Sequence, residues 1–269
     1  MRLLNIKDVQ NMQLELMKKL HNFMQSNNLN YYLIAGSSLG AARHKGFIPW
    51  DDDIDIGLFR EDYERFIKLS SSFSKEYEVV NYRNCKKCDF GLTRIYLPHT
   101  YIENPSIKNT ILDQRLYFDI FPLDNVPDDI KELNKFEKEI ITMKKLVQRI
   151  DVRNNNNSIF VLFCKKIISL CLTPLRTYII ALFDRLCQKY IDIDSKCVCS
   201  LFSQYSFKRQ VIPKEVYGVP TLHVFETEQF YVPERLDTYL TILYGPNYYE
   251  VPPIEKRRKG FKIYSIKEV

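Results

Sequence analysis

Hydrophobic and polar positions change period several times along the chain, and each change predicts a new element. Apolar residues recur at helical spacing on one face of residues 9–24, so a first amphipathic helix is expected there, capped by Asp8. A shorter amphipathic helix is expected at 60–67. Segments rich in β-forming or alternating residues predict strands at 31–35, 53–57, 78–82, 92–97 and 116–121. Together these elements indicate a mixed sheet flanked by helices.

Beyond Pro127 the pattern becomes mainly helical. An amphipathic helix is expected at 130–150 and a polar break at 154–157, and residues 159–183 form the most apolar stretch of the chain. Charged residues and Pro174 interrupt that stretch, which argues against a membrane span. Two interpretations stay open: a pair of core helices separated at Pro174, or a basic, apolar surface that rests on a membrane as a peripheral contact.

The acidic strand carries the strongest chemical signal. Side chains on a strand alternate faces, so Asp53 and Asp55 are expected on one face while Ile54 and Ile56 enter the core. Two carboxylates on one face repel each other, and a hard divalent cation would compensate both. We therefore predict a Mg²⁺ (or Mn²⁺) site at this pair. The alternative is an acidic edge strand that discourages aggregation.

A third carboxylate is expected from the strand at 116–121. Asp119 lies within this apolar, aromatic run, where a carboxylate is costly unless it is paired or bound to a metal. We expect Asp119 to complete the metal site with Asp53 and Asp55; a hydrogen-bonded structural aspartate is the alternative. Asp124 is expected to start a turn instead.

A phosphate-binding turn is expected just before the acidic strand. The strand at 31–35 ends at a Gly-Ser pair, and the two serines are good N-cap residues for a following helix. A helix start leaves backbone N–H groups unpaired and favours anions such as phosphate. The residues expected around that phosphate are Gly36, Ser37, Ser38, Arg43 and Lys45. A tight strand-to-helix connection without a ligand is the alternative.

Charge and cysteine content narrow the class of protein. The chain has 39 Lys and Arg against 33 Asp and Glu, a net charge of +6 that suits a polyphosphate ligand or an anionic membrane surface. No sequence pattern indicates nucleic acid as a partner. Residues 1–25 lack the apolar core of a signal peptide, and 7 scattered cysteines argue against a disulfide framework, so a cytoplasmic protein is expected. A zinc site at Cys85, Cys88, Cys197 and Cys199 and free thiols both stay open.

The chain resembles the LicD family of phosphocholine transferases and the related fukutin-type proteins. The family pattern R-H-K-G-F-I-P-W-D-D-D-I-D-I-G matches Arg43–Gly57 without interruption, and D-I-F-P-L-D matches Asp119–Asp124. The family's terminal pattern is matched loosely by Tyr244-Gly245, Pro252-Pro253 and Glu255-Lys256-Arg257. Many relatives carry histidines soon after that last motif, where this chain reads Arg258-Lys259-Gly260. Residues from about 130 to 220 match no pattern of the family.

The resemblance implies an α+β fold with a nucleotidyltransferase-like mixed sheet. Residues 1–130 would form the catalytic core, and residues 131–269 would be a mainly helical region that completes the site on the acceptor side; one compact domain is the alternative. Members transfer a phospho-alcohol, such as phosphocholine, from a CDP-activated donor to a sugar hydroxyl. The acceptor is a cell-surface glycan (lipopolysaccharide, capsule or teichoic acid) or its lipid-linked precursor.

The resemblance also assigns roles to matching residues. Asp53, Asp55 and Asp119 would hold the metal and carry catalysis, with the glycine-serine turn and its basic neighbours around the donor phosphates. Arg94, where relatives often have a basic residue, would reach the donor phosphate or form a surface ion pair. Asp119 is the first candidate for the base that accepts the sugar hydroxyl proton, and Asp51 is the second.

Two other functions are weighed against this one. A nucleotidyltransferase that moves NMP from an NTP would use the same acids and turn. A non-catalytic glycan-binding relative would have kept the fold alone, but the intact acids argue against it. A lipid-linked acceptor would bring the cytoplasmic enzyme to the inner face of the membrane, with residues 159–183 as the peripheral contact.

Overall fold

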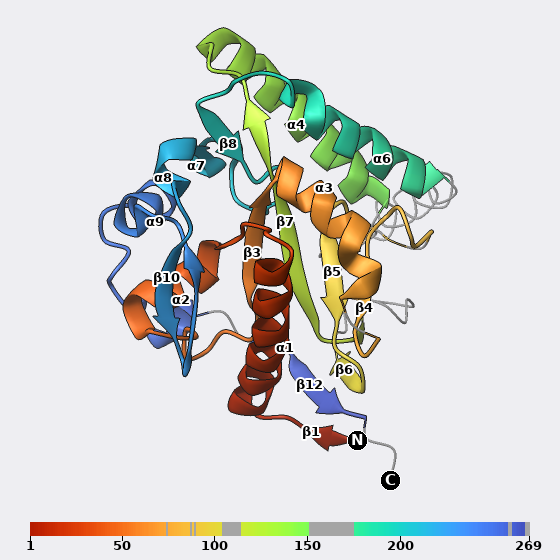
Figure 1. The fold of residues 1–269 in the computed structure, drawn as a ribbon, viewed down its shortest axis with the longest axis vertical. Helices are drawn as coiled ribbons and strands as arrows, with labels where there is room; N and C mark the ends of the chain where they lie inside the picture. The colour runs from red at the N-terminus through yellow and green to blue at the C-terminus, as the bar shows by residue number, and fades with distance from the viewer. Residues whose placement is uncertain are drawn as a thin grey trace.

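The computed structural model describes residues 1–73, 75–86, 88, 90–103, 114–150, 175–257 and 260–266. Its centre is a seven-stranded mixed sheet (Figure 1). The main strands are ordered β2 (Tyr32–Leu33), β3 (Asp55–Phe59), β7 (Tyr117–Val126), β5 (Thr93–Tyr96) and β4 (Glu78–Val80). β8 (Cys197–Cys199) pairs with the second half of β7, and β9 (Val211–Pro213) pairs with β8. β3 and β7 run parallel, whereas the other neighbours are antiparallel.

Helix α1 (Ile6–Ser26) covers one face of this sheet (Figure 1). Its apolar stripe joins a core cluster with the sheet residues Ile54, Ile56, Phe118 and Ile120, all of them buried. The helix starts one turn earlier than the sequence suggests, because Asn5 is the cap and Asp8 completes the reciprocal capping box. Since strand residues alternate faces, Asp55 and Asp119 are left on the opposite face.

That opposite face is covered by α2 (Ala35–His44) and by elements from the C-terminal half. Helix α9 (Leu236–Tyr244) packs on α2, and a second core cluster joins both helices to the sheet. The neighbouring elements are α7 (Phe207–Gln210) and α8 (Lys214–Tyr217). A hairpin of β10 (Thr221–Phe225) and β11 (Glu228–Val232) packs beside β2, and its residues Phe225, Phe230 and Val232 join the core cluster of α1. Sequence remote from the acidic strand therefore builds much of this side.

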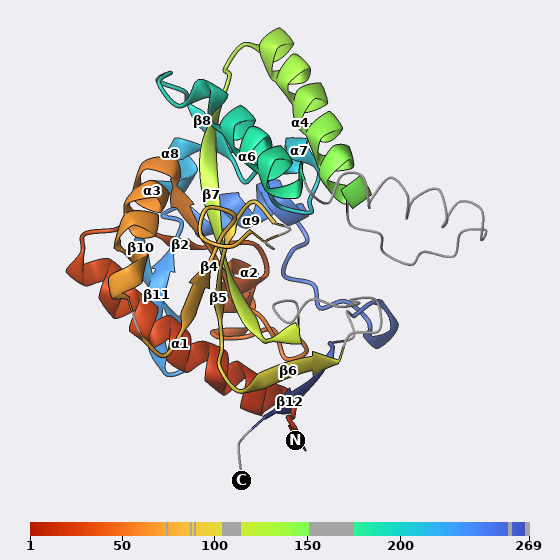
Figure 2. The same ribbon diagram turned by 90° about the vertical axis from the view of Figure 1, so that its right-hand side faces the viewer.

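Helices α4 (Ile130–Ile150) and α6 (Arg176–Cys187) lie together at one end of the sheet (Figures 1 and 2). Helix α3 (Arg60–Leu69) packs against β3 and β7, and its residues Tyr63 and Phe66 join the same core cluster as α1. Helices α4 and α6 pack together and enclose a third core cluster with β8. Short 3-10 turns lie at Ser70–Ser72, Gln188–Tyr190 and Ile254–Lys256.

A separate three-stranded sheet brings the two ends of the chain together (Figure 2). It consists of β1 (Arg2–Leu3), β12 (Lys262–Ser265) and β6 (Thr100–Glu103), with β12 in the middle. This pairing carries Gly260 toward the acidic loop, since a Cβ at that position would lie 3.5 Å from Asp52 Oδ2. The C-terminal segment therefore borders the acids.

The α+β class and the mixed sheet are confirmed. The helix predicted at 130–150 is present with those bounds. The residues beyond 130 also supply strands β8 to β12, so they extend the sheets as well as adding helices. Most of the apolar stretch at 159–183, including Pro174, lies outside the described residues, as do Arg258 and Lys259; its last part begins α6.

Candidate active site

Two of the predicted acids face each other across adjacent strands. Asp55 is the first residue of β3, and its Cα pairs with that of Asp119 in the parallel register of β3 and β7. Asp53 lies in the loop just before β3 rather than within the strand, because β3 starts two residues later than predicted. Ile54 and Ile56 are buried on the α1 side, as the alternation predicts.

All three predicted acids line one cavity of about 400 Å³, here called the acidic cavity. Arg94 lines it too, together with Ala35 at the start of α2. Its walls also contain residues from the C-terminal half, among them Ser200, Tyr205 and Tyr239. The fold thus brings together carboxylates from separate stretches of chain in a partly aromatic cavity.

Arg94 forms a buried ion pair with Asp119. Its Nε donates a hydrogen bond to Asp119 Oδ1 at 2.8 Å, and only 17% of the Arg94 side chain and 15% of the Asp119 side chain are exposed. The guanidinium lies 4.1 Å from the ring centroid of Phe90 and 4.0 Å from that of Tyr117. Burial raises the pKa of Asp119, and Arg94 opposes this rise. The ion pair was predicted as an alternative, but its predicted surface position is wrong.

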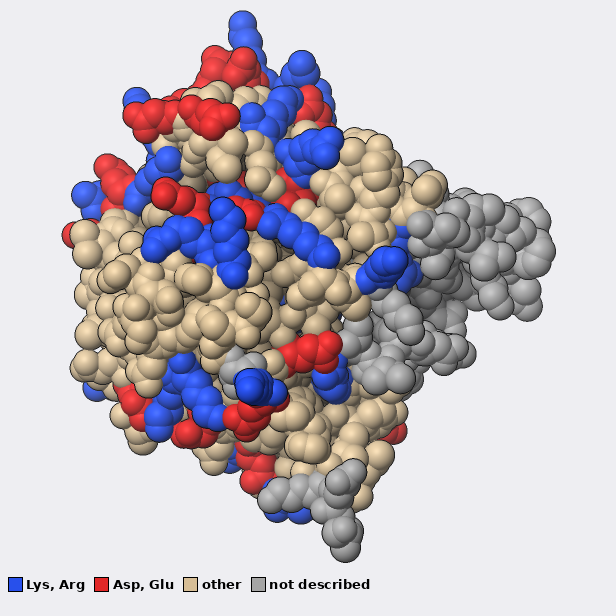
Figure 3. Space-filling view, turned by 45° about the vertical axis from the view of Figure 1, so that its right-hand side comes forward, with Lys and Arg blue, Asp and Glu red and all other residues tan. Residues whose placement is uncertain are grey.

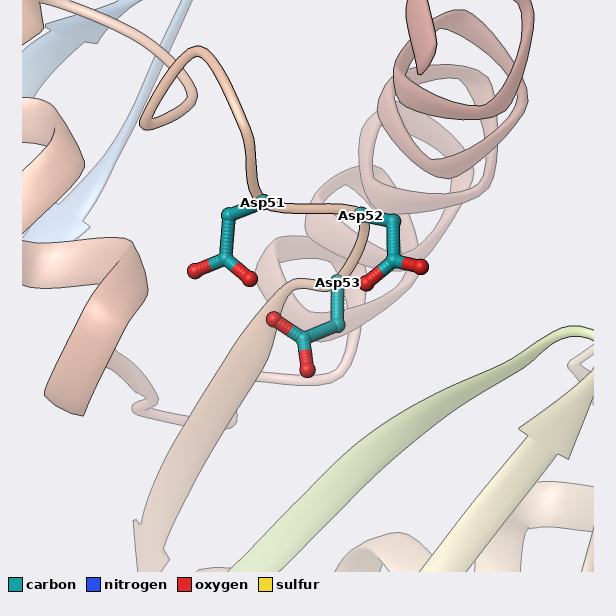
Figure 4. Close-up of side chains that lie close together, drawn as sticks. All are labelled: Asp51, Asp52 and Asp53. Carbon is teal, nitrogen blue, oxygen red and sulfur yellow. The ribbon is translucent and has the colours of Figure 1, made fainter. Parts of the chain in front are cut away.

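A compact acidic group lies in the loop just before β3 (Figure 4). The carboxyl groups of Asp51, Asp52 and Asp53 project to the same side of the loop, and one oxygen from each lies within 4.8 Å of the others. Within the described parts of the chain, this is the one set of three acidic, His or Cys side chains with that proximity. The trio Asp53, Asp55 and Asp119 shares the cavity without being so compact, and the four cysteines discussed above form no such group either.

The Gly-Ser segment is helical, so the predicted turn is wrong. Helix α2 starts at Ala35, whose φ of +47° lies in the left-handed region that is strained for alanine. The Ala35 N–H donates to the hydroxyl of Tyr239 from α9 at 3.0 Å. This tertiary contact fixes the helix start one turn earlier than a serine cap would.

The two serines hold the backbone of the site. Ser37 Oγ accepts a hydrogen bond from the Asp55 N–H at 2.8 Å, which ties α2 to the start of β3. Ser38 is buried and donates to the Leu33 carbonyl. Gly36 lies beside the acidic group, since a Cβ there would be 3.2 Å from Asp51 Oδ2. None of Gly36, Ser37 and Ser38 is among the residues that line the acidic cavity.

Arg43 and Lys45 are also placed away from the acidic cavity. The helix runs through His44, so ten residues at 1.5 Å each carry Lys45 about 15 Å from Ala35. Arg43 Nη1 donates to the carbonyl oxygens of Tyr248 and Glu250, whereas Lys45 is exposed at the helix end. Neither of these two predicted phosphate ligands lines the acidic cavity.

Residues beyond 190 contribute contacts that sequence reasoning missed. Ser200 is 3% exposed and lines the acidic cavity, and its hydroxyl has no hydrogen-bond partner among the described residues. An unpaired buried hydroxyl is costly unless a ligand or water completes it. Tyr205 lines the same cavity and shares a 3.1 Å hydrogen bond with Tyr244. No local pattern around Ser200 distinguishes it from other serines.

Asp124 has a structural role, and its predicted turn is wrong. It lies within β7, is buried, and accepts two hydrogen bonds from Arg60, at 2.6 Å and 2.8 Å. Arg60 also donates to Asp184 of α6 at 2.9 Å. Burial raises the pKa of Asp124 to about 6, against the opposing effect of Arg60. This network joins β7 to α3 and α6.

The surface shows no segregation of charge on the face drawn in Figure 3. Basic and acidic side chains are interspersed there among the described residues. No helix among the described residues is long and apolar enough to cross a membrane.

Comparison with known proteins identifies the domain that carries these acids. Residues 28–145 match the family described as LicD/FKTN/FKRP, nucleotidyltransferase domain. The chain is 26% identical over 266 residues to the lipopolysaccharide cholinephosphotransferase LicD of Haemophilus influenzae, with 96% of each protein covered. It is 49% identical over 39 residues to the human ribitol 5-phosphate transferase FKRP, which covers 14% of this chain and 8% of that protein. Residues 28–145 therefore form a domain of the LicD/FKTN/FKRP family, and the resemblance seen in the sequence is confirmed.

Proposed function

We propose that this protein is a metal-dependent transferase that moves a phospho-alcohol from a CDP-activated donor to a sugar hydroxyl. The acceptor would be a cell-surface glycan or its lipid-linked precursor. The observation that carries the proposal is the meeting of Asp53, Asp55 and Asp119 in one cavity, within a domain of this family. Both named relatives are phospho-alcohol transferases, one for choline phosphate and one for ribitol phosphate.

The donor set suits a hard divalent cation. Carboxylate oxygens are the protein ligands that Mg²⁺ and Mn²⁺ prefer, and such ions usually share them with substrate phosphates. Asp53 and Asp55 would hold the ion with Asp119 as a third ligand. Asp53 also belongs to the compact group with Asp51 and Asp52. When bound, the ion would neutralise charge on the diphosphate and on the departing CMP.

The chain's own residues would then orient the donor and move a proton. Asp119 is our candidate base for the sugar hydroxyl, since burial raises its pKa and so makes it a better proton acceptor. Arg94 would keep that carboxyl oriented through Nε. Asp51 is the second candidate base. The partnerless Ser200 hydroxyl is suited to a donor oxygen in the acidic cavity.

A second candidate is a nucleotidyltransferase that moves NMP from an NTP. The description of the matched domain favours it, and the same acids would serve. The two reactions differ in their products, because phospho-alcohol transfer releases CMP whereas nucleotidyl transfer releases pyrophosphate.

Product analysis tests the proposal. The protein is incubated with CDP-choline, CDP-ribitol or CDP-glycerol, a glycan acceptor extract and Mg²⁺, and the nucleotides are identified by mass spectrometry. We expect CMP from at least one donor, with none formed in EDTA. Pyrophosphate from an NTP, without CMP from any of these donors, would favour nucleotidyl transfer instead.

A cytoplasmic enzyme at the inner membrane face would fit a lipid-linked acceptor, and flotation with anionic liposomes tests that placement.

A further inference from the structure

A second cavity of about 410 Å³ lies next to the acidic group, and we call it the tryptophan cavity. The N-terminal segment, the loop before β3 and the segment before β12 line it, and it is open to solvent. Trp50, Phe261 and Pro49 give it flat apolar surfaces, Ile6 adds an aliphatic one, and Asp52 lines it as a carboxylate. Neither the metal nor the donor phosphates, as assigned above, account for this cavity.

The indole of Trp50 is held in place from outside the cavity. The guanidinium of Arg257 lies 4.2 Å from the Trp50 ring centroid, and Arg257 Nε donates to the Pro252 carbonyl at 3.0 Å. His44 meets the indole edge-on with ring centroids 6.2 Å apart. Neither Arg257 nor His44 lines the cavity, so these contacts orient the indole without filling the space beside it.

The two cavities meet at the acids. Phe261 lines both, Asp52 lines the tryptophan cavity and Asp53 lines the acidic cavity. Carboxylate oxygens of Asp52 and Asp53 lie within 4.8 Å of each other. A group bound in one cavity is therefore separated from the other cavity by little more than one carboxylate and one phenyl ring.

We propose that the tryptophan cavity binds the sugar ring that carries the acceptor hydroxyl; this inference rests on the proposed function. A pyranose has an apolar C–H face that stacks on aromatic rings and hydroxyl groups that need polar partners. Trp50 and Phe261 provide the aromatic surface, and Asp52 accepts hydrogen bonds from ring hydroxyls. Pre-oriented aromatic side chains bind such a ring with little loss of conformational freedom.

The transfer reaction to a sugar bound in the tryptophan cavity forms one bond and breaks one. The acceptor oxygen forms a bond to the phosphorus that carries the alcohol, and the bond from that phosphorus to the bridging oxygen breaks. CMP leaves with the electron pair, and the hydroxyl proton passes to a carboxylate of the site.

Trp50 makes the proposal testable without turnover, because it is the chain's 1 tryptophan. Methyl glucoside, methyl galactoside and methyl N-acetylglucosaminide are titrated in EDTA without donor, and the emission of Trp50 is followed. We expect a saturable change at millimolar concentration with at least one glycoside, and none with sorbitol, which lacks a ring. Phe261→Ala should weaken this binding at least about fivefold through the lost ring contact. Tyr249→Ala, at an exposed aromatic outside both cavities, should leave it unchanged.

No saturable change with any of the three glycosides, or equal affinity in Phe261→Ala, would overturn the assignment. Turnover gives a second, independent readout: Trp50→Leu should raise KM for the acceptor at least about tenfold and leave KM for the donor within about twofold. Sugar binding without CMP release from any donor would contradict the proposed function and keep the cavity assignment. CMP release without sugar binding would contradict the cavity assignment and keep the proposed function.

Discussion

Replacing Arg94 by methionine should destabilise the protein strongly, because it leaves Asp119 buried without its counter-ion. The pair is 2.8 Å long and each side chain is less than one-fifth exposed. Removing one partner of a buried ion pair costs about 3–5 kcal/mol. The contacts of the guanidinium with Phe90 and Tyr117 add about 1 kcal/mol each, although part of this overlaps with the first figure. We therefore expect the free energy of unfolding to fall by at least about 3 kcal/mol.

Urea unfolding in EDTA, followed by circular dichroism, measures this loss, and the melting temperature should fall by about 6 °C or more. The control is a double-mutant cycle with Asp119→Asn. The amide carries no charge, so Arg94→Met/Asp119→Asn should be less destabilised than Arg94→Met alone. Arg94→Lys should lie between these variants, since it keeps the charge but loses the planar stacking.

A loss below about 1 kcal/mol in Arg94→Met, or additive effects in the cycle, would refute this reasoning. Such a result would instead indicate that Arg94 serves mainly the donor phosphates. In that case the variant would keep its stability and show a raised KM for the donor.

Further predictions concern the pH dependence and the backbone of the site. The pKa of Asp124 is raised to about 6 in the folded state, against a value near 4 in the unfolded state, so the folded state binds this proton more tightly. The contribution of Asp124 to stability is therefore lost as the pH rises from about 4 to 6. Asp124→Asn should flatten this pH dependence of the free energy of unfolding, measured by unfolding curves across the range. Gly40→Ala should lower the free energy of unfolding in urea by about 1–3 kcal/mol, because the added Cβ would clash with the carbonyl oxygen of Gly46. An unchanged free energy of unfolding would contradict this and show that the backbone at Gly46 moves aside. Ser37→Ala removes the acceptor for the Asp55 N–H and should cost about 1–2 kcal/mol, with Ser37→Thr closer to wild type; equal losses in both variants would contradict this.

Local pattern was sufficient to predict the strands that carry Asp55 and Asp119. The alternation after Asp53 predicted which residues are buried, and the apolar run around Asp119 predicted a strand that could carry a third carboxylate. Neither prediction needed knowledge of distant residues, because strand periodicity alone assigns the faces. The pairing of Asp55 with Asp119 followed once both strands joined one sheet.

The start of α2 could not be predicted in this way. The serines at its first turn have the composition of a cap, but the helix begins at Ala35, where the hydroxyl of Tyr239 receives the N–H. That partner lies 204 residues away in the sequence. A strained φ at alanine is tolerated when such tertiary contacts fix it, and propensity does not report them.

The partners of the buried charges could not be predicted from the sequence either. Asp124 has the sequence context of a turn, whereas its partner Arg60 is 64 residues away and Asp184 belongs to a segment with no recognisable motif. Strands β8 and β9 are three residues each, too short for any periodicity to be recognised. Ser200 reaches the acidic cavity because β8 pairs with β7.

The most direct test of the central claim is the rate of Mg²⁺-dependent CMP release by Asp55→Asn. Asp128→Asn is the matched control, because Asp128 is exposed and lies outside the acidic cavity. If Asp55 holds the cation, the rate should fall at least about 100-fold while the melting temperature stays within about 2 °C of wild type, and the control should be unaffected. A rate for Asp55→Asn within about fivefold of wild type would contradict the claim that these carboxylates form the active site.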